Sequence, residues 1–209
     1  MNYFKTLPLI TQTDPYGNKT TVNNLLSRAY FVPSLLNNIM SYYTYDVRDN
    51  DTPEIISYKY YNDIYSYWVV LYSNNITDPT GDWVKTSEQF ILYLNDKYST
   101  AANGVANVLP YTTSTVHHYE QYITTQNSYD NVGQTITIQI DSDTYNSFVD
   151  SSTTATLSDG TSVTKSMSAS AISIYNYELE QNEKKRNIKI MNKNYLPSVQ
   201  SQFEVLMRS

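Results

Sequence analysis

Residues 42–83 constrain the fold more than any other stretch, because they hold most of the densest apolar run and both tryptophans. Their first signal is a strand, in which large side chains alternate with Thr44 and Asp46, the period-two pattern of a segment with one buried face. The alternating large side chains are Tyr43, Tyr45 and Val47. Turn-forming residues at 48–51 end this strand.

Two short helices are predicted after the turn. Thr52 can cap the first, with Pro53 at its first position and an acidic residue in its first turn. Ile56 and Tyr60 lie four apart and therefore share one face of that helix. Asp63 can cap the second helix.

The second helix has an apolar stripe and a polar end. The stripe consists of Trp68, Leu71 and Tyr72, widened by Val69 and Val70. Asn74-Asn75 fits a left-handed C-terminal cap. The order predicted for the whole stretch is strand, helix, helix.

The residues that carry this order resemble a LysM module. They are Tyr45, Val47, Asn50-Asp51-Thr52, Ile56-Ser57, Tyr60, Trp68, Leu71 and Asn74-Asn75-Ile76. The LysM family usually has Gly-Asp-Thr at residues 50–52, and Asn tolerates the positive φ that this turn needs. The closing strand of an ordinary LysM module, with its Gly-Gln-x-Leu pattern, is absent from the sequence.

Two further blocks are similar to the LysM-like baseplate wedge subunits of contractile-tailed, T4-type phages, the gene product fifty-three family. The first block is Asp78-Pro79-Thr80-Gly81-Asp82-Trp83, followed by Ser87-Glu88-Gln89-Phe90 and Lys97-Tyr98. The second is Asn182-Glu183-Lys184-Lys185-Arg186, followed by Ile188-Lys189-Ile190. A shorter match covers residues 24–28.

The resemblance implies a structural role in the phage tail. It implies a subunit that binds other wedge proteins and joins adjacent wedges around the hub, in multiple copies, six or a multiple of six. It also implies a location in the virion baseplate and assembly in the host cytoplasm. The predicted interface residues are Asp78, Pro79, Asp82 and Trp83, with Glu183, Lys185 and Arg186 as interface charges. For Trp83 a core position, and for residues 184–186 a solvated helix end, are the alternatives.

Ordinary LysM modules suggest a different function, the binding of peptidoglycan and other N-acetylglucosamine polymers. The family binds such glycans through the loops after the first strand and after the second helix. Here these loops would contain Asn50, Asp51, Thr52, Asn74 and Asn75. The single copy and the lack of a hydrolase domain argue against this alternative.

Composition excludes several classes of function. The net charge of -6 disfavours a nucleic-acid partner. The absence of cysteine removes disulfides, thiolate catalysis and thiolate metal sites. No segment has the roughly 20 apolar residues of a membrane span, and we expect neither a signal peptide nor a membrane partner. The 22 tyrosines fit a protein interface, although codon usage in an AT-rich genome would also explain them.

The rest of the chain is divided into three predicted parts around a LysM-like domain with its following helix at residues 42–98. Residues 1–41 form an arm with an extended segment, a turn at residues 14–18 and a helix through Val22, Leu25, Leu26 and Ala29. Pro33 either ends that helix or starts another one through Leu35, Leu36, Ile39 and Met40. The arm either completes the module's core or packs on a neighbouring subunit, and we favour the neighbour for part of it.

Residues 99–171 are rich in Ser, Thr and Asn, which permits disorder. Alternation at Ile136, Ile138 and Ile140 favours a small antiparallel sheet instead, with a further strand at residues 119–125. Asp159-Gly160 predicts a two-residue type I′ hairpin turn within residues 154–168.

Residues 172–209 are predicted to form a helix, a strand and a helix. The first helix covers residues 172–183 and the strand residues 187–190. The last helix covers residues 195–207, with a stripe of Leu196, Val199, Phe203 and Leu206. The fold class predicted for the chain is α+β.

Candidate catalytic and metal-binding residues form no complete set. His117 and His118 are the only histidines, and neighbours in a strand point to opposite faces. Asp49, Asp51 and Glu54 fit a turn and a helix start better than a glycosidase carboxylate pair. Residues 141–143 begin like a calcium loop, but Tyr145 occupies a ligand position. We therefore expect no catalytic residues, no metal and no cofactor.

Overall fold

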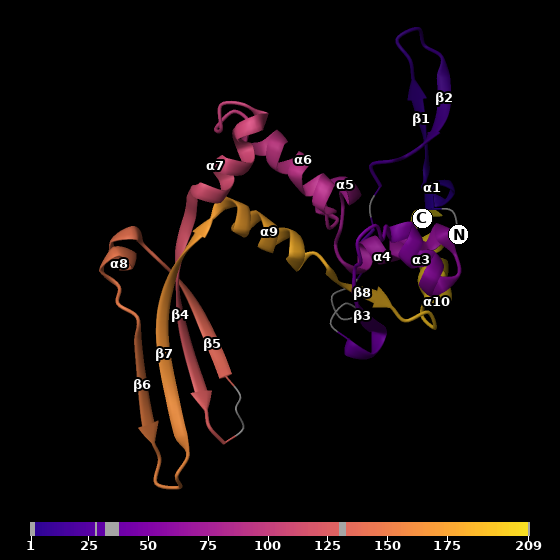
Figure 1. Ribbon diagram of the computed structural model, residues 1–209. Helices are drawn as coiled ribbons and strands as arrows, with labels where there is room; N and C mark the ends of the chain where they lie inside the picture. The colour runs from indigo at the N-terminus through magenta and orange to yellow at the C-terminus, as the bar shows by residue number, and fades with distance from the viewer. Residues whose placement is uncertain (1–2, 28, 32–37, 130–132, 209) are drawn as a thin grey trace. The chain divides into compact units, whose positions relative to one another are not determined.

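The computed structural model describes residues 3–27, 29–31, 38–129 and 133–208 (Figure 1). Its residues group into two compact units. Unit 1 contains Met1–Thr86 together with Glu183–Ser209, and unit 2 contains Ser87–Asn182. Helices and small antiparallel sheets occur together, which confirms the α+β class. The four-part division made from the sequence remains a prediction.

Unit 1 contains short helices and two two-stranded sheets. Its helical elements are α1 Tyr3–Thr6, η1 Ile39–Ser41, α3 Pro53–Tyr61, η2 Ile64–Ser66, α4 Tyr67–Ser73, α5 Pro79–Asp82 and α10 Leu196–Arg208. Its strands are β1 Leu9–Thr13, β2 Lys19–Asn23, β3 Tyr42–Asp46 and β8 Asn187–Met191. Strand β3 pairs antiparallel with β8, and β1 pairs antiparallel with β2.

The strand–helix–helix order is present as β3, α3 and α4, and local side chains define the helix ends. Thr52 accepts the Ile55 N–H at the start of α3, and Pro53 occupies a first-turn position. Asp63 caps η2 through the Tyr65 N–H at 3.0 Å. Asn75 is left-handed, with φ of 54°. The predicted caps at Thr52 and Asn75 are confirmed. Asp63 caps the short turn η2 that leads into α4, while the N-cap of α4 itself is Ser66, which makes no side-chain capping bond.

Helix α4 ends in a Schellman motif. The Ile76 N–H donates to the Leu71 carbonyl at 3.0 Å, and the Asn75 N–H donates to the Tyr72 carbonyl at 3.3 Å. The left-handed Asn75 makes this pair of bonds possible, because Asn adopts positive φ at lower cost than most residues.

Two core clusters hold unit 1 together, and β8 contributes to both. The first cluster consists of Leu7, Ala29, Trp68, Val69, Met191, Val199, Phe203 and Met207. The second consists of Val47, Ile56, Val70, Val84, Ile188 and Ile190. Successive residues of β8 point to opposite faces, so Met191 enters one cluster and Ile190 the other.

The N-terminal arm divides between core and surface. Tyr3 stacks on Phe203, with ring centroids 5.4 Å apart, and Leu7 is buried in the first cluster. Beyond it, every residue of β1 and β2 is exposed. The turn predicted at residues 14–18 is confirmed, and Asp14 accepts the N–H groups of Tyr16 and Asn18.

The helix predicted through Val22 and Ala29 is wrong. Val22 lies in strand β2, opposite Ile10, although its spacing with Leu25 and Leu26 is helical. The β-branched run at residues 20–22 and the preceding turn favour a hairpin. The helix boundary expected at Pro33 lies outside the described residues.

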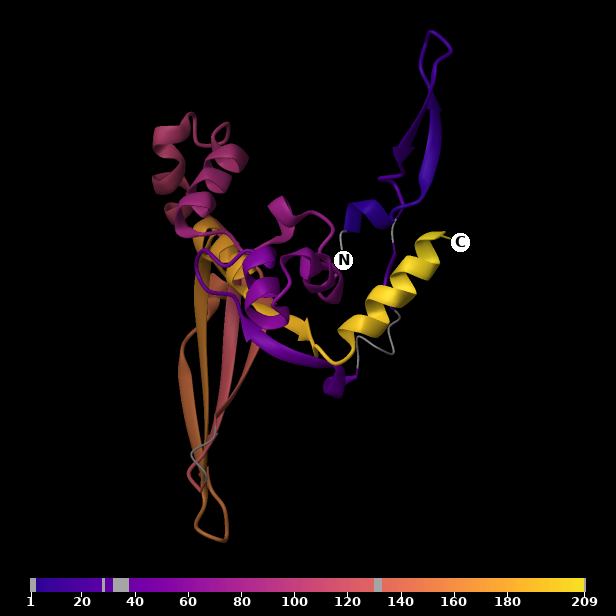
Figure 2. The same ribbon diagram turned by 90° about the vertical axis from the view of Figure 1, so that its right-hand side faces the viewer.

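Unit 2 contains a helical group and a four-stranded sheet. Its helical elements are α6 Ser87–Tyr98, η3 Val105–Asn107, α7 Val108–Ser114, α8 Ser142–Ser147 and α9 Ile174–Lys184. Its strands are β4 Val116–Asn127, β5 Gly133–Ile140, β6 Ser151–Thr156 and β7 Ser162–Ser173. Most of these helices gather near one end of the strands, and the sheet extends away from them as a single layer (Figures 1 and 2).

The helical group has its own core, in which Phe90, Leu94, Ala102 and Val108 are buried. Beside this core lies a buried carboxylate, Glu178, which is 5% exposed. It accepts hydrogen bonds from Lys97 Nζ at 2.6 Å and from the hydroxyls of Tyr98 and Tyr93 at 2.6 and 2.9 Å. Burial opposes its ionisation, but these donors outweigh burial and lower the pKa of Glu178.

The strands predicted at residues 119–125 and around Ile138 are confirmed as parts of β4 and β5. The sheet order is β5-β4-β7-β6, and all pairs are antiparallel. Helix α7 was not predicted, because the Ser, Thr and Asn content of its surroundings hid a short apolar group at Val108.

The hairpin between β6 and β7 is real, but its predicted type I′ turn is wrong. A type I′ turn needs positive φ at both central residues, whereas Gly160 has φ of +83° and Asp159 is not among the residues with positive φ. Gly160 N–H donates to the Leu157 carbonyl, and Leu157 N–H donates to the Thr161 carbonyl. The loop is therefore a longer turn that ends in a left-handed glycine.

Both C-terminal helices differ slightly from their predictions. Helix α9 starts at Ile174, because residues 172 and 173 still belong to β7. In α10 the buried stripe is Val199, Phe203 and Met207, while Leu206 is 57% exposed and points away from the core. The strand at residues 187–190 is confirmed as β8. Within the described residues, no helix has the length and apolarity needed to cross a membrane.

We predict that Glu178→Gln lowers the free energy of unfolding by about 2 kcal/mol, because it removes the buried, charged acceptor of three partly buried hydrogen bonds. The loss should be largest near neutral pH. The folded-state pKa is lowered, so the contribution of Glu178 is present above the ordinary glutamate range and is lost as the pH falls through the folded-state pKa.

Urea unfolding from pH 3 to pH 7 measures this effect, and Glu180→Gln, at an exposed position of the same helix, is the control. A pH-independent difference between wild type and Glu178→Gln would contradict the assignment of the effect to ionised Glu178.

Candidate protein-interaction surface

Three segments of unit 1 that are far apart in the sequence meet at one surface. The indole N–H of Trp83 donates to the Asp51 carbonyl at 2.9 Å, and Lys185 Nζ donates to the Gly81 carbonyl at 2.9 Å. We call residues 48–52, 78–83 and 183–186 the three-segment surface. It contains all seven predicted interface residues and three of the residues predicted for a glycan site.

The corner at residues 78–83 is rigid because its side chains bond to its own backbone. Asp78 caps α5 by accepting the Thr80 N–H at 2.9 Å. Asp82 accepts the N–H of Asp78 at 3.2 Å. A Cβ at Gly81 would lie 2.6 Å from the carboxylate of Asp78, so only glycine fits this position without movement of that cap.

Trp83 connects this corner to the core. Its ring is half-buried and packs on the second core cluster, and its N–H bonds to the turn at Asp51. The core position considered as an alternative for Trp83 is therefore part of its role. Asp78, Pro79 and Asp82 remain exposed.

The Gly81 carbonyl accepts hydrogen bonds from two lysines, Lys85 at 3.0 Å and Lys185 at 2.9 Å. Burial and the neighbouring Lys185 charge lower the pKa of Lys85, while Asp78 and Asp82 oppose this shift. The corner thus combines exposed acids with partly buried ammonium groups.

Arg186 joins the third segment to the first. Its guanidinium donates to the Val47 carbonyl at 3.0 Å and forms ion pairs with Asp49 at 3.0 Å and Glu183 at 2.5 Å. The Asp49 side chain is 63% exposed and that of Glu183 is 46% exposed, so both carboxylates keep a free side toward solvent. Asp49 was predicted only as a turn residue. No local signal identifies its ion pair, which depends on the pairing of β3 with β8.

In the first predicted glycan loop, the side chains of Asp51 and Thr52 make hydrogen bonds within unit 1. Asn50 has φ of 69°, as its turn requires. Asp51 is 7% exposed and accepts hydrogen bonds from Lys59 Nζ at 2.6 Å and the Tyr45 hydroxyl at 2.7 Å. Burial raises the pKa of Asp51, but these bonds outweigh it, and the net shift is downward. The hydroxyl of Thr52 caps α3.

In the second predicted glycan loop, the Asn74 side chain also makes its hydrogen bonds within unit 1. The Asn74 amide nitrogen donates to the carbonyls of Val70 and Lys189, both at 2.8 Å, and its oxygen accepts the Lys189 N–H at 2.7 Å. Asn74 therefore pairs with the backbone of β8 as another strand would. Asn75 supplies the left-handed end of α4.

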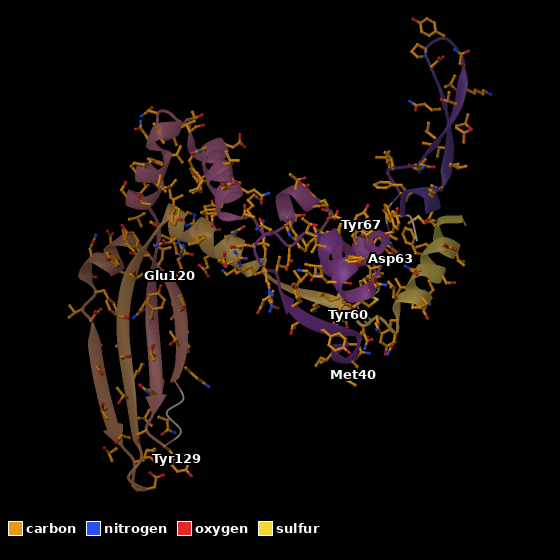
Figure 3. All side chains as sticks on the ribbon, turned by 45° about the vertical axis from the view of Figure 1, so that its right-hand side comes forward. Met40, Tyr60, Asp63, Tyr67, Glu120 and Tyr129 are labelled. Carbon is orange, nitrogen blue, oxygen red and sulfur yellow. The ribbon has the colours of Figure 1, made fainter. Side chains whose placement is uncertain are left out.

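The histidines do not point to opposite faces as predicted. The β4–β7 pairing has a register shift between Val116 and His118, and the two rings meet with Nδ1 atoms 2.8 Å apart. His118 Nε2 lies 3.0 Å from Glu120, which is labelled in Figure 3. In the part of the chain that the structure describes, no group of three or more His, Asp or Glu side chains could hold a metal ion.

The other candidate carboxylates have structural partners. Asp141 caps α8 by accepting the Thr144 N–H at 2.8 Å, which is a helix start and not a calcium loop. Tyr145, in the same helix, stacks on Tyr119 with ring centroids 4.5 Å apart. Asp49 and Asp51 are paired with Arg186 and Lys59 respectively.

Comparison with known proteins adds one match. The family model of base plate wedge protein 53 matches residues 20–208, which is nearly the whole chain. The match includes all three segments of the three-segment surface and the whole of unit 2. No curated protein matches the chain.

We predict that Asn74→Ala lowers the free energy of unfolding by about 2 kcal/mol, because it leaves the N–H and C=O of Lys189 without their side-chain partner. Asn75→Gly is the matched control, since glycine adopts the same positive φ and should change stability by less than about 0.5 kcal/mol. Thermal unfolding followed by circular dichroism measures both. Equal effects of the two substitutions would rule out the role assigned to the Asn74 side chain.

Proposed function

The chain belongs to the base plate wedge protein 53 family, and we propose that it binds other wedge subunits and joins adjacent wedges around the hub of a phage tail baseplate. A wedge protein is a structural component of the virion tail. The observation that carries the proposal is the family match over residues 20–208. We further propose that several copies, six or a multiple of six, enter each virion after assembly in the host cytoplasm.

The three-segment surface is our candidate for the contact with another wedge subunit. Its backbone is held by the Trp83 and Lys185 hydrogen bonds, so it is ordered before a partner binds. A preformed surface loses less conformational entropy on association than a mobile one. Its exposed carboxylates, at Asp49, Asp78, Asp82 and Glu183, favour a partner with basic side chains.

Exposed apolar residues on unit 1 provide a second kind of contact. Leu26, Ile39 and Met40 are 88%, 88% and 79% exposed, and Figure 3 shows Met40 at the surface. Every residue of the β1–β2 hairpin is also exposed, including Leu9 and Ile10. Apolar surface of this kind is typical of subunits whose partners cover it, which supports the packing of part of the arm on a neighbour.

Loss of the protein from the phage tests the function. We expect that a phage with this gene disrupted accumulates wedge complexes without closed baseplates, and that the wild-type chain supplied in trans restores tails. Mass spectrometry of purified wild-type tails should detect the chain. Complete tails assembled without it would refute the proposal.

A charge reversal tests the three-segment surface. Glu183→Lys replaces an exposed carboxylate, and we expect it to weaken the contact at least about tenfold, which corresponds to about 1.4 kcal/mol of binding free energy, and so to lower the yield of closed baseplates. Lys193→Glu, an exposed charge reversal elsewhere on unit 1, is the control and should assemble normally. Thermal unfolding of both variants separates a loss of contact from a loss of folding. Normal assembly with Glu183→Lys would exclude this surface as the contact.

Glycan binding is the alternative that the LysM resemblance raises. The side chains of Asp51 and Asn74 are engaged in hydrogen bonds within unit 1, which leaves them less available to a sugar. We predict that the purified chain is not retained on peptidoglycan or chitin. Saturable retention that free N-acetylglucosamine oligomers compete away would favour the alternative.

A further inference from the structure

The sheet of unit 2 has one apolar face and one polar face. The pairing of the strands assigns each residue to a face, because directly opposite residues lie on the same side. One face, called the apolar face here, carries the large apolar side chains Ile136, Ile138, Ile140, Tyr119, Ile123 and Met167 with Ala169 and Ala171, and also the polar Gln121, Thr125, Gln134 and Lys165. The other carries mostly Ser and Thr, with Glu120, Tyr122 and Gln139.

The apolar face is not covered in the way that a core is. No residue of β4, β5, β6 or β7 is fully buried. Helix α8 covers one end of the face, where Tyr145 stacks on Tyr119. Farther along the sheet, Ile136 is 61% exposed and Ile138 is 43% exposed. Both of these side chains belong to β5.

Strand β5 is an edge strand, and it lacks the features that usually protect an edge. In the described part of the chain its only strand partner is β4. It has 8 residues without a charge or a proline, and it pairs with β4 without a register shift. Edge strands are commonly protected by lysine, proline, a bulge or a short length. The unpaired N–H and C=O groups of β5 can therefore accept another strand.

We propose that β5 pairs antiparallel with β5 of a second copy of this chain, about a two-fold axis at Thr137. This inference does not depend on the proposed function. In this pairing residues 134–140 of one copy lie opposite residues 140–134 of the other. Ile136 then lies opposite Ile138 of the second copy, and Thr137 lies opposite Thr137. The two four-stranded sheets join into one continuous sheet.

The sequence of β5 favours a second copy over a different strand. Its isoleucines occupy alternate positions, so an antiparallel self-pairing centred on Thr137 places both apolar faces on the same side. Ile136 and Ile138, the two most exposed isoleucines of β5, cover each other across the pair. Cross-strand pairs of β-branched residues stabilise a sheet. No charge in β5 opposes the approach of an identical strand. The other edge strand, β6, carries only Ser, Thr and Ala and offers no comparable apolar match.

A single cysteine tests the register, because the natural chain has none. Residues directly opposite in an antiparallel pair have Cα atoms about 4.5 or 5.5 Å apart, within the range of a disulfide. We expect Thr137→Cys to form a disulfide-linked dimer of the full chain under mild oxidation. Thr154→Cys, on the polar face of β6, is the matched control and should stay mostly monomeric on a non-reducing gel.

Charge variants test the pairing without a cross-link. Thr137 is exposed on the polar face, so Lys or Glu there leaves the apolar face intact. We expect wild type to sediment as a dimer at micromolar concentration and Thr137→Lys and Thr137→Glu each to dissociate at least about tenfold more readily, because like charges oppose each other across the axis. A 1:1 mixture of the two variants should restore the dimer.

The outcomes decide between this pairing and its alternatives. A monomeric wild type, or a dimer that neither charge variant weakens, overturns the proposal. Efficient cross-linking at Thr154 also overturns it, in favour of β6 pairing with β6. Sedimentation of species larger than a dimer overturns it in favour of open-ended association. Circular dichroism of each variant verifies that the chain is folded.

Discussion

The pairing of β3 with β8 is the interaction on which unit 1 depends. It joins Tyr42–Asp46 to Asn187–Met191, segments separated by the whole of unit 2. Both core clusters contain residues of β8, so neither is complete without it. The same pairing brings Arg186 to Val47 and Asp49, and Lys185 to Gly81. The candidate interaction surface is therefore a direct result of this one long-range pairing.

Unit 2 follows a different physical principle. Its helices enclose a small core beside the buried Glu178, whereas its sheet depends on main-chain pairing and on threonine contacts such as Thr124 with Thr135 at 2.9 Å. Domains usually bury a sheet face against a second layer. Among the described residues of unit 2, only α8 covers part of the apolar face of this sheet. The arrangement is therefore incomplete, and a partner strand or subunit can complete it.

The parts of the fold that depend on neighbouring residues could be predicted from the sequence. Thr52, Asp63 and Asn75 act within a few residues of themselves, and their capping roles follow from residue type and position. The strand at Ile136 and Ile138 was predicted from its period for the same reason. The helix expected at Val22 failed because a helical spacing of apolar residues does not outweigh β-branched residues beside a tight turn.

Long-range features could not be predicted in this way. Nothing near Asp49 indicates Arg186 as its partner, and nothing near Asn74 indicates that it bonds the backbone of Lys189. The meeting of His117 and His118 depends on a bulge whose position periodicity cannot reveal. The interface residues were predicted from resemblance, and their common location follows only from the folded chain.

The order of the two units along the chain has a consequence for biosynthesis. Residues 87–182 are continuous, so unit 2 has all of its residues as soon as they leave the ribosome. Unit 1 must wait for β8 and α10, since Met191, Val199 and Phe203 complete its first core cluster. Because domains fold as units during synthesis, the middle of the polypeptide should mature before its flanks. The folded surface of unit 1 would then form on the nascent chain only after α10 has left the ribosome.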